Sequence, residues 1–345
     1  MRRLATLSAV LALLLAACGG GGDGEGNDGD GAGSDTTTAA GDFDPDAVAI
    51  YVGEGFDVSR IEPGGGSSSQ LVDGLTDCYE TWFLDGSVWV SCTDGELLRL
   101  DPESGDIQLD IQTGDYIEEI AVGEGAIWVL NGSVGIATEI NEVDPSSGEI
   151  LATISPDEGA FFWDLTAGEG AVWAVGGSAE TLSTIVRIDP ASATVSTVID
   201  TGILPARVEA GLGAVWVVGG GVLGVDGSGG NGVRLVQVDP GSNQVVSDLE
   251  VGDVDGYPDL AVAYDSVWVT DTVAGELVRV DASGKEVKAR VAIGTGGQDL
   301  FEIDVAKGLV WAGNPFDSQI FGVDPTTNEF ETGINGGAKG IAFAP

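Results

Sequence analysis

The sequence contains no histidine, one methionine, and 13 lysines and arginines against 56 aspartates and glutamates in 345 residues. Without histidine, the chain lacks the side chain that most often acts as a general base or metal ligand near neutral pH. The formal net charge of −43 makes nucleic acid and anionic lipid poor partners, because a strongly negative field repels polyanions. Three cysteines are too few for a disulfide-rich scaffold, and no Cys/His metal spacing, phosphate loop or nucleophile–base pair is present.

The one long apolar run lies at the N-terminus, after Met1-Arg2-Arg3, and extends over residues 4–15. It is too short to cross ~30 Å of hydrocarbon, so the pattern predicts an export signal peptide over residues 1–17. The segment Leu15-Ala16-Ala17-Cys18 resembles the bacterial lipobox, which implies a lipid on Cys18. The alternative is an ordinary signal peptide with an incidental cysteine. The lipoprotein interpretation places the chain outside the cytoplasm, anchored to a bacterial membrane.

Residues 18–46 are mostly Gly, Asp, Ser and Thr, with few apolar side chains. Such a segment cannot bury enough surface to offset its ordering entropy, so we expect a disordered tether. The folded domain is expected over residues 47–345.

The remainder of the chain is a repeat. An aromatic residue flanked by small or branched apolar residues recurs at spacings of 38 to 52 residues, and an acid ends an apolar run about a dozen residues after each one. The aromatics are Tyr51, Trp89, Trp128, Trp173, Trp216, Trp268 and Trp311. Each copy contains four short predicted strands separated by Gly-rich turns, a pattern typical of β-propeller blades. We expect the aromatics to pack between blades and the acids, as in Arg187-Ile188-Asp189-Pro190, to form turns.

The two ends of the repeat complement each other. The first copy starts at Val48 with the strand that carries its aromatic, and it lacks the strand that precedes this one in the other copies. The segment Gly340-Ile341-Ala342-Phe343 has the sequence of that missing strand, and no further strand follows it. Pairing the last strand with the first copy removes the open edges of the ring. We therefore predict an all-β fold, a seven-bladed β-propeller closed by N- and C-terminal strands in one blade.

Cys78 and Cys92 remain after Cys18 is assigned to the lipid. Folding the hairpin at Asp85-Gly86 brings them opposite or nearly opposite each other on adjacent strands, and exported chains usually pair such cysteines. We predict a disulfide. Two free thiols are the alternative.

The Val-Trp-Val and Ile-Asp-Pro elements resemble those of the bacterial YVTN-type propellers and, within that group, the streptogramin B (virginiamycin) lyase-like proteins. The resemblance covers residues 48–345 and specifies the blade rather than the chemistry. It implies a histidine base beside a magnesium ion held by acids. Because the chain has no histidine, we do not expect the lyase reaction. Lactonase-type propellers hold a divalent ion with Glu, Asn and Asp, and they remain an alternative.

A column of charged residues begins the first strand of the blades, nine residues before each tryptophan: Glu80, Glu119, Asp164, Arg207, Asp259 and Glu302. A second column lies three residues after the aromatic and includes Asn131, Asp271 and Asn314. Because the first two strands form a hairpin, we expect the columns to face each other. First strands lie nearest the channel, so both would gather around one channel mouth.

Oxygen ligands of this kind suit Ca²⁺ or Mg²⁺, so we predict a divalent-cation site formed by some of the five acids. The first choice for the carboxylate ligands is Glu302, Glu80 and Glu119. Further oxygen ligands would come from Asn131, Asp271 and Asn314. The positive charge of Arg207 is a candidate to balance the acids without a metal. Aromatics expected near the mouth, Tyr79, Trp163, Tyr257 and Phe301, form with Arg207 a predicted ligand rim for a cation, sugar or peptide. The alternative is that the acids lie at ordinary solvated strand ends and accept hydrogen bonds from the backbone amides of loops.

The prediction for function is therefore a membrane-anchored module that binds a ligand or a protein through an acidic channel mouth rimmed with aromatics. The alternative is a metal-dependent lyase or hydrolase of lactonase type, and we lean against an enzyme because histidine is missing.

Overall fold

The computed structural model describes residues 49–344, except for gaps at 55–56, 62–67, 73–74, 76–77, 93–94, 115, 134–135, 179–180, 222–231, 253–257, 294–301, 307, 315–318 and 336–340. The side chains of residues 49–70, 79–80, 136, 221, 302, 306, 314, 319–320 and 331–344 also lie outside the description. The chain divides into two units, Met1–Phe43 and Asp44–Pro345. The predicted signal, Cys18 and the tether fall outside the described residues. Within the described part, no helix has the length and hydrophobicity to cross a bilayer.

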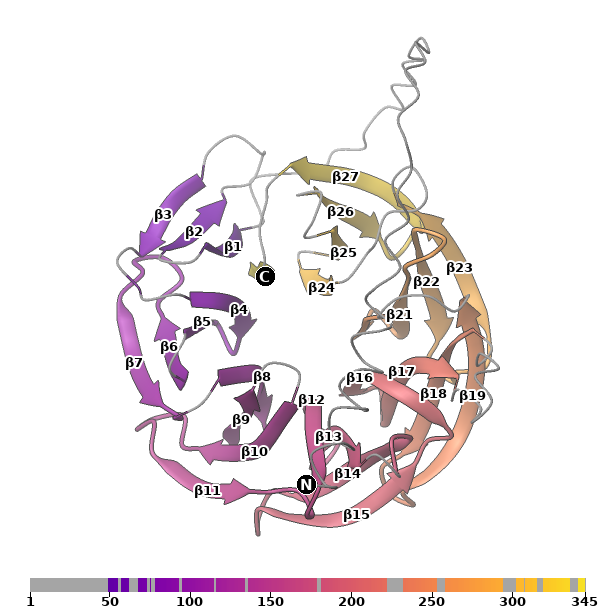
Figure 1. The fold of residues 1–345 in the computed structure, drawn as a ribbon. Helices are drawn as coiled ribbons and strands as arrows, with labels where there is room; N and C mark the ends of the chain where they lie inside the picture. The colour runs from indigo at the N-terminus through magenta and orange to yellow at the C-terminus, as the bar shows by residue number, and fades with distance from the viewer. Residues whose placement is uncertain are drawn as a thin grey trace, which may run out of the picture. The chain divides into compact units, whose positions relative to one another are not determined.

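The described residues of the unit Asp44–Pro345 are all-β, and their strands form seven four-stranded units with antiparallel pairing, arranged in a ring (Figure 1). Each unit, here called a blade, runs from an innermost strand to an outermost one. The innermost strands are β28 (Ile341–Ala344), β4 (Cys78–Leu84), β8 (Tyr116–Gly123), β12 (Ala160–Gly168), β16 (Ile203–Gly211), β20 (Leu260–Ala263) and β24 (Glu302–Ala306). The second strands are β1 (Ala49–Glu54), β5 (Ser87–Cys92), β9 (Ala126–Ser133), β13 (Ala171–Ser178), β17 (Ala214–Gly221), β21 (Ser266–Asp271) and β25 (Leu309–Asn314).

The outer half of each blade follows the same order. The third strands are β2 (Asp57–Ile61), β6 (Glu96–Leu100), β10 (Ile136–Val143), β14 (Thr184–Asp189), β18 (Val233–Asp239), β22 (Glu276–Asp281) and β26 (Gln319–Asp324). The fourth strands are β3 (Ser68–Val72), β7 (Ile107–Gln112), β11 (Ile150–Ile154), β15 (Thr194–Asp200), β19 (Gln244–Gly252), β23 (Val287–Ala292) and β27 (Glu329–Asn335). Blades 3 and 4 are also joined directly by one pair, Ala137 on β10 with Phe162 on β12.

The first blade contains strands from both ends of the chain. Strand β28 pairs antiparallel with β1, from Ala344 opposite Ala49 to Ile341 opposite Val52. The sheet order is therefore β28-β1-β2-β3, with the C-terminal strand innermost. This pairing is the one expected from the complementary ends of the repeat.

Tight hairpins join the innermost strand of a blade to the second strand. In blades 3 and 4 the two central turn residues, Glu124-Gly125 and Glu169-Gly170, all have positive φ. This conformation matches the twist of the strands but is strained for a glutamate. Each glutamate also accepts the amide of the next blade's turn, Gly170 N at 3.0 Å from Glu124 Oε1 and Gly213 N at 2.9 Å from Glu169 Oε1. The strained residues thus link successive blades.

The tryptophans form the core between blades, as predicted. Trp128, Trp173 and Trp216 have exposed fractions of 0% and pack with apolar residues of neighbouring strands. Trp128 of blade 3, for example, lies in one cluster with Val172 and Ile188 of blade 4. Their burial supplies the hydrophobic driving force that holds the blades together.

The repeated acids form turns, again as predicted. Asp144 Oδ1 accepts the backbone amides of Ser146 and Ser147, each at 2.9 Å, and Asp189 Oδ1 bonds Ala191 and Ser192 in the same way. These donors favour the carboxylate, and with the serine hydroxyls they lower the pKa of Asp144 to about 2. The aspartates therefore have a structural role.

Candidate functional site

A central cavity of about 560 Å³ lies along the innermost strands of blades 2 to 7. Its wall is formed by residues of β4, β8, β12, β16, β20 and β24, together with Asp259, which directly precedes β20. The propeller architecture thus brings together residues that are far apart in the sequence. Charged, hydroxyl, aliphatic and indole groups share this wall.

A recurrent irregularity shapes the wall. The pairing register shifts just before the charged column in four blades, between Cys78 and Glu80, Ile117 and Glu119, Phe162 and Asp164, and Pro205 and Arg207. A β-bulge of this kind re-aims a side chain and is common beside binding sites. In blades 3 and 4 the bulged residue and its successor both line the cavity, as Glu118 with Glu119 and Trp163 with Asp164.

Three of the predicted acids line the cavity and are held by N–H donors. Glu119 Oε1 accepts the indole N–H of Trp82 at 2.6 Å and its neighbour Ile120 N at 3.0 Å. Asp164 Oδ2 accepts Val208 N of the next blade at 2.6 Å. Asp259 accepts Leu260 N at 2.9 Å and, from the next blade, Ile303 N at 3.1 Å. The carboxylates therefore connect neighbouring innermost strands. This structural role corresponds to the alternative to metal binding that was considered from the sequence.

Arg207 contributes the positive charge of the described wall. Its Nε lies 3.7 Å from Asp259 Oδ1, and its side chain is 44% exposed while that of Asp259 is 17% exposed. Burial raises the pKa values of Glu119 and Asp164, and the charge of the guanidinium opposes that rise. Arg207 is thus a counter-charge inside the acidic wall, the role considered for it from the sequence.

A deeper layer of polar residues lies two positions further along the strands. Glu209, Asp304 and Thr166 line the cavity there, and Thr166 donates a hydrogen bond to Glu209. These residues were not predicted from the sequence, because they belong to neither of the two columns. Alternate residues of a strand point to the same face, so the residues two positions after the members of the first column are expected to line the same cavity.

Burial changes the acidity of this cluster. Desolvation is the largest cause, and it raises the pKa of Glu119 to about 7 and that of Glu209 to about 8. Burial also raises the pKa of Asp164 well above its ordinary value and that of Asp259 as well, with neighbouring carboxylates adding to the rise for Asp164. Arg207 opposes the shift at Glu119, Asp164 and Asp259. The cavity therefore holds carboxyl groups that exchange protons near neutral pH.

Two tryptophans are fixed in the wall by their indole N–H groups. Trp82 donates to Glu119, and Trp163 donates to Pro205 O at 3.1 Å. Trp163 also lies 5.2 Å from Phe161, measured between ring centroids. Trp163 was predicted for the rim, whereas Trp82 was not. The side chains of Tyr79, Tyr257 and Phe301, also predicted for the rim, lie outside the described residues.

The second predicted column does not join the first. Asn131 donates to Thr113 Oγ1 at 2.7 Å and accepts from Asn141 Nδ2 at 2.9 Å. The Asp271 carboxylate lies 3.3 Å from Arg290 Nη1 of β23. Neither residue is part of the cavity lining. The expected alignment fails because the two-residue turn at Glu124-Gly125 sets Glu119 opposite Leu130, so that Asn131, one position further along, belongs to the other face of the strand.

The metal prediction rests partly on side chains that the structure does not describe, those of Glu80, Glu302 and Asn314. Among the described side chains, no group of three or more acids or cysteines is arranged to hold a metal ion. Metal binding therefore stays a prediction.

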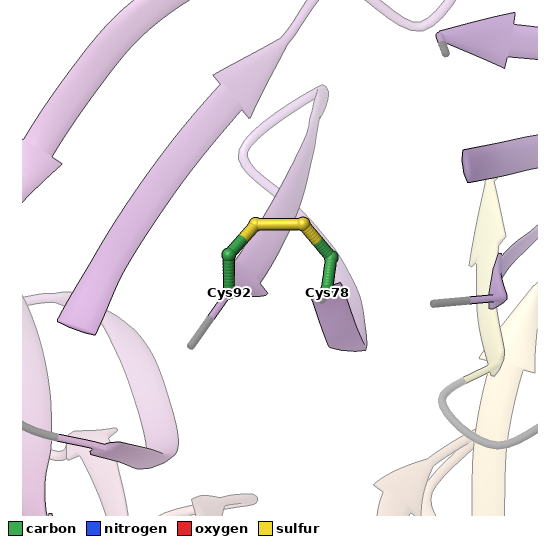
Figure 2. The surroundings of a disulfide bond; sticks show 2 residues. All are labelled: Cys78 and Cys92. Atoms are coloured by element: carbon green, nitrogen blue, oxygen red, sulfur yellow. A yellow bond between two sulfur atoms is a disulfide. The ribbon is translucent and has the colours of Figure 1, made fainter. Parts of the chain in front are cut away.

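Cys78 and Cys92 form a disulfide between β4 and β5, as Figure 2 shows. The two residues lie directly opposite each other in the register of the hairpin, with their Cα atoms 3.8 Å apart. The bond closes the end of the hairpin at which the blade 2 bulge begins, just before the residues of β4 that line the cavity.

Comparisons with known proteins identify the fold. Residues 112–256 match the model of a family described as a repeat of unknown function (DUF6923). No curated protein matches the sequence. Among solved structures, similar folds include a functionally unknown protein from Desulfotomaculum acetoxidans, with 12% identity, coverage of 86% of this chain and 98% of that chain, and a TM-score of 0.62. BamB from Moraxella catarrhalis has 13% identity, coverage of 87% and 88%, and a TM-score of 0.55.

A third similar structure is the WD40 domain of Pan2 from Neurospora crassa, with 10% identity, coverage of 76% of this chain and 80% of that chain, and a TM-score of 0.57. At these identities the similarity concerns the fold alone. It agrees with the β-propeller.

Proposed function

We propose that this chain is a lipid-anchored extracytoplasmic propeller that binds a small organic ligand in its central cavity. The observation that carries the proposal is the cavity of about 560 Å³, lined by Trp82 and Trp163 together with several acids and Arg207, some of them held by hydrogen bonds. Small-molecule sites usually enclose about 300–1,000 Å³ and combine apolar rings with a few positioned polar groups. The wall is also preorganised, because Asp164 and Asp259 are held by amides of the next blade.

The test compares a variant with a filled cavity to a matched surface variant. Ala261 lines the cavity, so Ala261→Phe places a ring in it, whereas Ala282 is exposed in a turn and Ala282→Phe leaves the cavity open. A panel of small organic molecules with positive, neutral and negative charge is screened by saturation-transfer NMR. We expect at least one class to bind the wild-type chain and Ala282→Phe but not Ala261→Phe. Binding that survives Ala261→Phe would place the ligand elsewhere.

A protein partner on the rim is the competing interpretation of the same face. Such a partner contacts loops rather than the inner wall, so the filled cavity would leave its binding unchanged. No binding by any class of small molecule would favour this interpretation over ours.

Anchoring through Cys18 rests on the Leu-Ala-Ala-Cys segment that resembles a lipobox. Expression with radiolabelled palmitate should label the wild-type chain and not Cys18→Ala, and the variant should leave the membrane fraction. Equal labelling of both chains would contradict lipidation at this residue.

A metal-dependent hydrolase or lyase, as the lactonase-type and streptogramin lyase-like resemblances suggest, is the second candidate. One observation favours it: carboxyl groups whose pKa values are raised to about 7 and about 8 are suited to proton transfer at neutral pH. Calcium or magnesium added to chelator-treated protein should then raise the melting temperature, and Glu119→Gln/Glu302→Gln should lose most of that rise. No shift at millimolar metal would remove this candidate.

A further inference from the structure

We propose that the ligand of the central cavity is an organic cation that carries a guanidinium or primary ammonium group. This inference rests on the proposed binding function and names the chemical class of the ligand. It follows from the charge of the wall, from a guanidinium that the wall already holds, and from the aromatic groups beside them.

The described wall is strongly unbalanced in charge. Its only described cation is Arg207, and its acids are Glu118, Glu119, Asp164, Glu209, Asp259 and Asp304. Carboxylates that share a partly buried site repel one another, which raises the free energy of the ionised state. A cation inside the cavity relieves this repulsion, whereas an anion increases it. The wall therefore selects for positive charge among ligands of equal size.

The protein itself places a guanidinium against this wall. Arg207 lies 3.7 Å from Asp259, too far for a direct hydrogen bond, and Arg207 keeps 44% of its side chain exposed. The carboxylates of Glu119, Asp164 and Asp259 each interact with it. The single guanidinium of Arg207 thus interacts with several carboxylates, and it cannot donate a hydrogen bond to every one of their oxygens. A second planar cation has the donors to bond the acceptors that remain.

Aromatic groups complete the site. Trp82 and Trp163 line the cavity beside the acids, and their indole groups are oriented by N–H bonds to Glu119 and Pro205. Indole rings attract organic cations through their electron-rich faces, more strongly when the cation is partly desolvated. A small inorganic ion would not use this surface, and the described acids do not gather into a group of three around one point. The wall fits a larger cation with an apolar body.

The experiment uses a series of equal chain length in which only the end groups change: cadaverine (1,5-diaminopentane), 1,5-pentanediol and glutarate, with agmatine as the guanidinium probe. Binding to the full chain is measured by calorimetry at pH 8.5, above the pKa values of Glu119 and Glu209, in 150 mM NaCl to suppress condensation of cations on the acidic surface. We expect cadaverine and agmatine to bind and the other two to give no heat.

Three variants localise the binding. Glu209→Gln removes a wall charge and should weaken agmatine about tenfold, a difference of ~1.4 kcal/mol, while Arg207→Gln removes the competing cation and should strengthen it by a similar factor. Glu149→Gln removes an exposed charge at the edge of β11 and should change nothing. The melting temperature of each variant without ligand shows that it is folded.

The outcomes separate this inference from the proposed function. Tighter binding of pentanediol or glutarate, lost in Ala261→Phe, would overturn the cation class and leave the binding function intact. Binding of agmatine that is equal in Glu209→Gln, Arg207→Gln and Glu149→Gln would show condensation on the surface and overturn the inference. Absence of binding by every member of the series and of the wider panel would overturn both.

Discussion

At the scale of single residues, the buried carboxyls of the cavity link stability to pH. Glu119 and Glu209 have pKa values of about 7 and about 8 in the folded protein, against an ordinary value of 4.5. From pH 5 to about 7 for Glu119, and from pH 5 to about 8 for Glu209, the unfolded chain has already released the proton while the folded chain still holds it. Stability therefore falls as pH rises through this window, by about 1.4 kcal/mol per pH unit for each proton retained.

Glu119→Gln/Glu209→Gln should lose much of this slope, because glutamine does not titrate. Denaturant unfolding at half-unit steps from pH 5 to 8 measures it, with Glu149→Gln as the control. The range stops at pH 5 because turn aspartates such as Asp144, whose pKa is lowered to about 2, act with the opposite sign in stronger acid. Equal slopes in the double variant and the wild-type chain would show that these carboxyls do not titrate as described.

At the scale of strands and blades, close approach between innermost strands sets the size of the ring. A Cβ on Gly123 at the end of β8 would lie 2.7 Å from the backbone oxygen of Ala167 in the next blade. Gly123 O also accepts the indole N–H of Trp128 at 3.2 Å. Gly123→Ala therefore forces two blades apart and should destabilise the domain by about 1–3 kcal/mol, measured by denaturant unfolding.

The matched control for this change is Gly220→Ala in β17, since a Cβ there meets no atom within 4 Å. Alanine at Gly220 should be neutral or slightly stabilising, because it restricts the unfolded chain. A loss of stability at Gly220 as large as that at Gly123 would remove close approach as the explanation.

The sequence predicted the regular features at this scale and missed the irregular ones. The spacing of the tryptophans and the Asp-Pro turns reports local period and turn chemistry, so blades, core and structural aspartates were predictable. The bulges at Glu118 and Trp163 each insert one residue into a strand, and the local pattern of apolar and polar residues does not predict them. The register set by the hairpin turn places Leu130, rather than Asn131, opposite Glu119. The bonds of Asp164 to Val208 and of Asp259 to Ile303 join blades, and they depend on packing that no single repeat encodes.

At the scale of the whole molecule, the fold depends on closure of the ring. Strand β28 is the innermost strand of the blade that β1 begins, so residues 338–345 are part of a blade rather than a tail. Their deletion should lower the melting temperature by about 10 °C or more, because a loss of several kcal/mol corresponds to such a shift in a domain of this size. It should also promote aggregation through the exposed edge of β1.

Removal of residues 19–26 from the predicted tether is the matched control for this deletion, and it should leave the melting temperature unchanged. Calorimetry measures both truncations. A C-terminal truncation as stable as the wild-type chain would mean that the pairing of β28 with β1 contributes little to closure.

Whether the channel of the propeller binds an organic cation is decided by a crystal structure of the protein grown with agmatine at pH 8.5. We expect density for the guanidinium inside the cavity, within hydrogen-bonding distance of the carboxylates of Asp164, Glu209 or Asp259 and beside Trp82 or Trp163. Agmatine found only on the outer surface, with the cavity occupied by water, would contradict it.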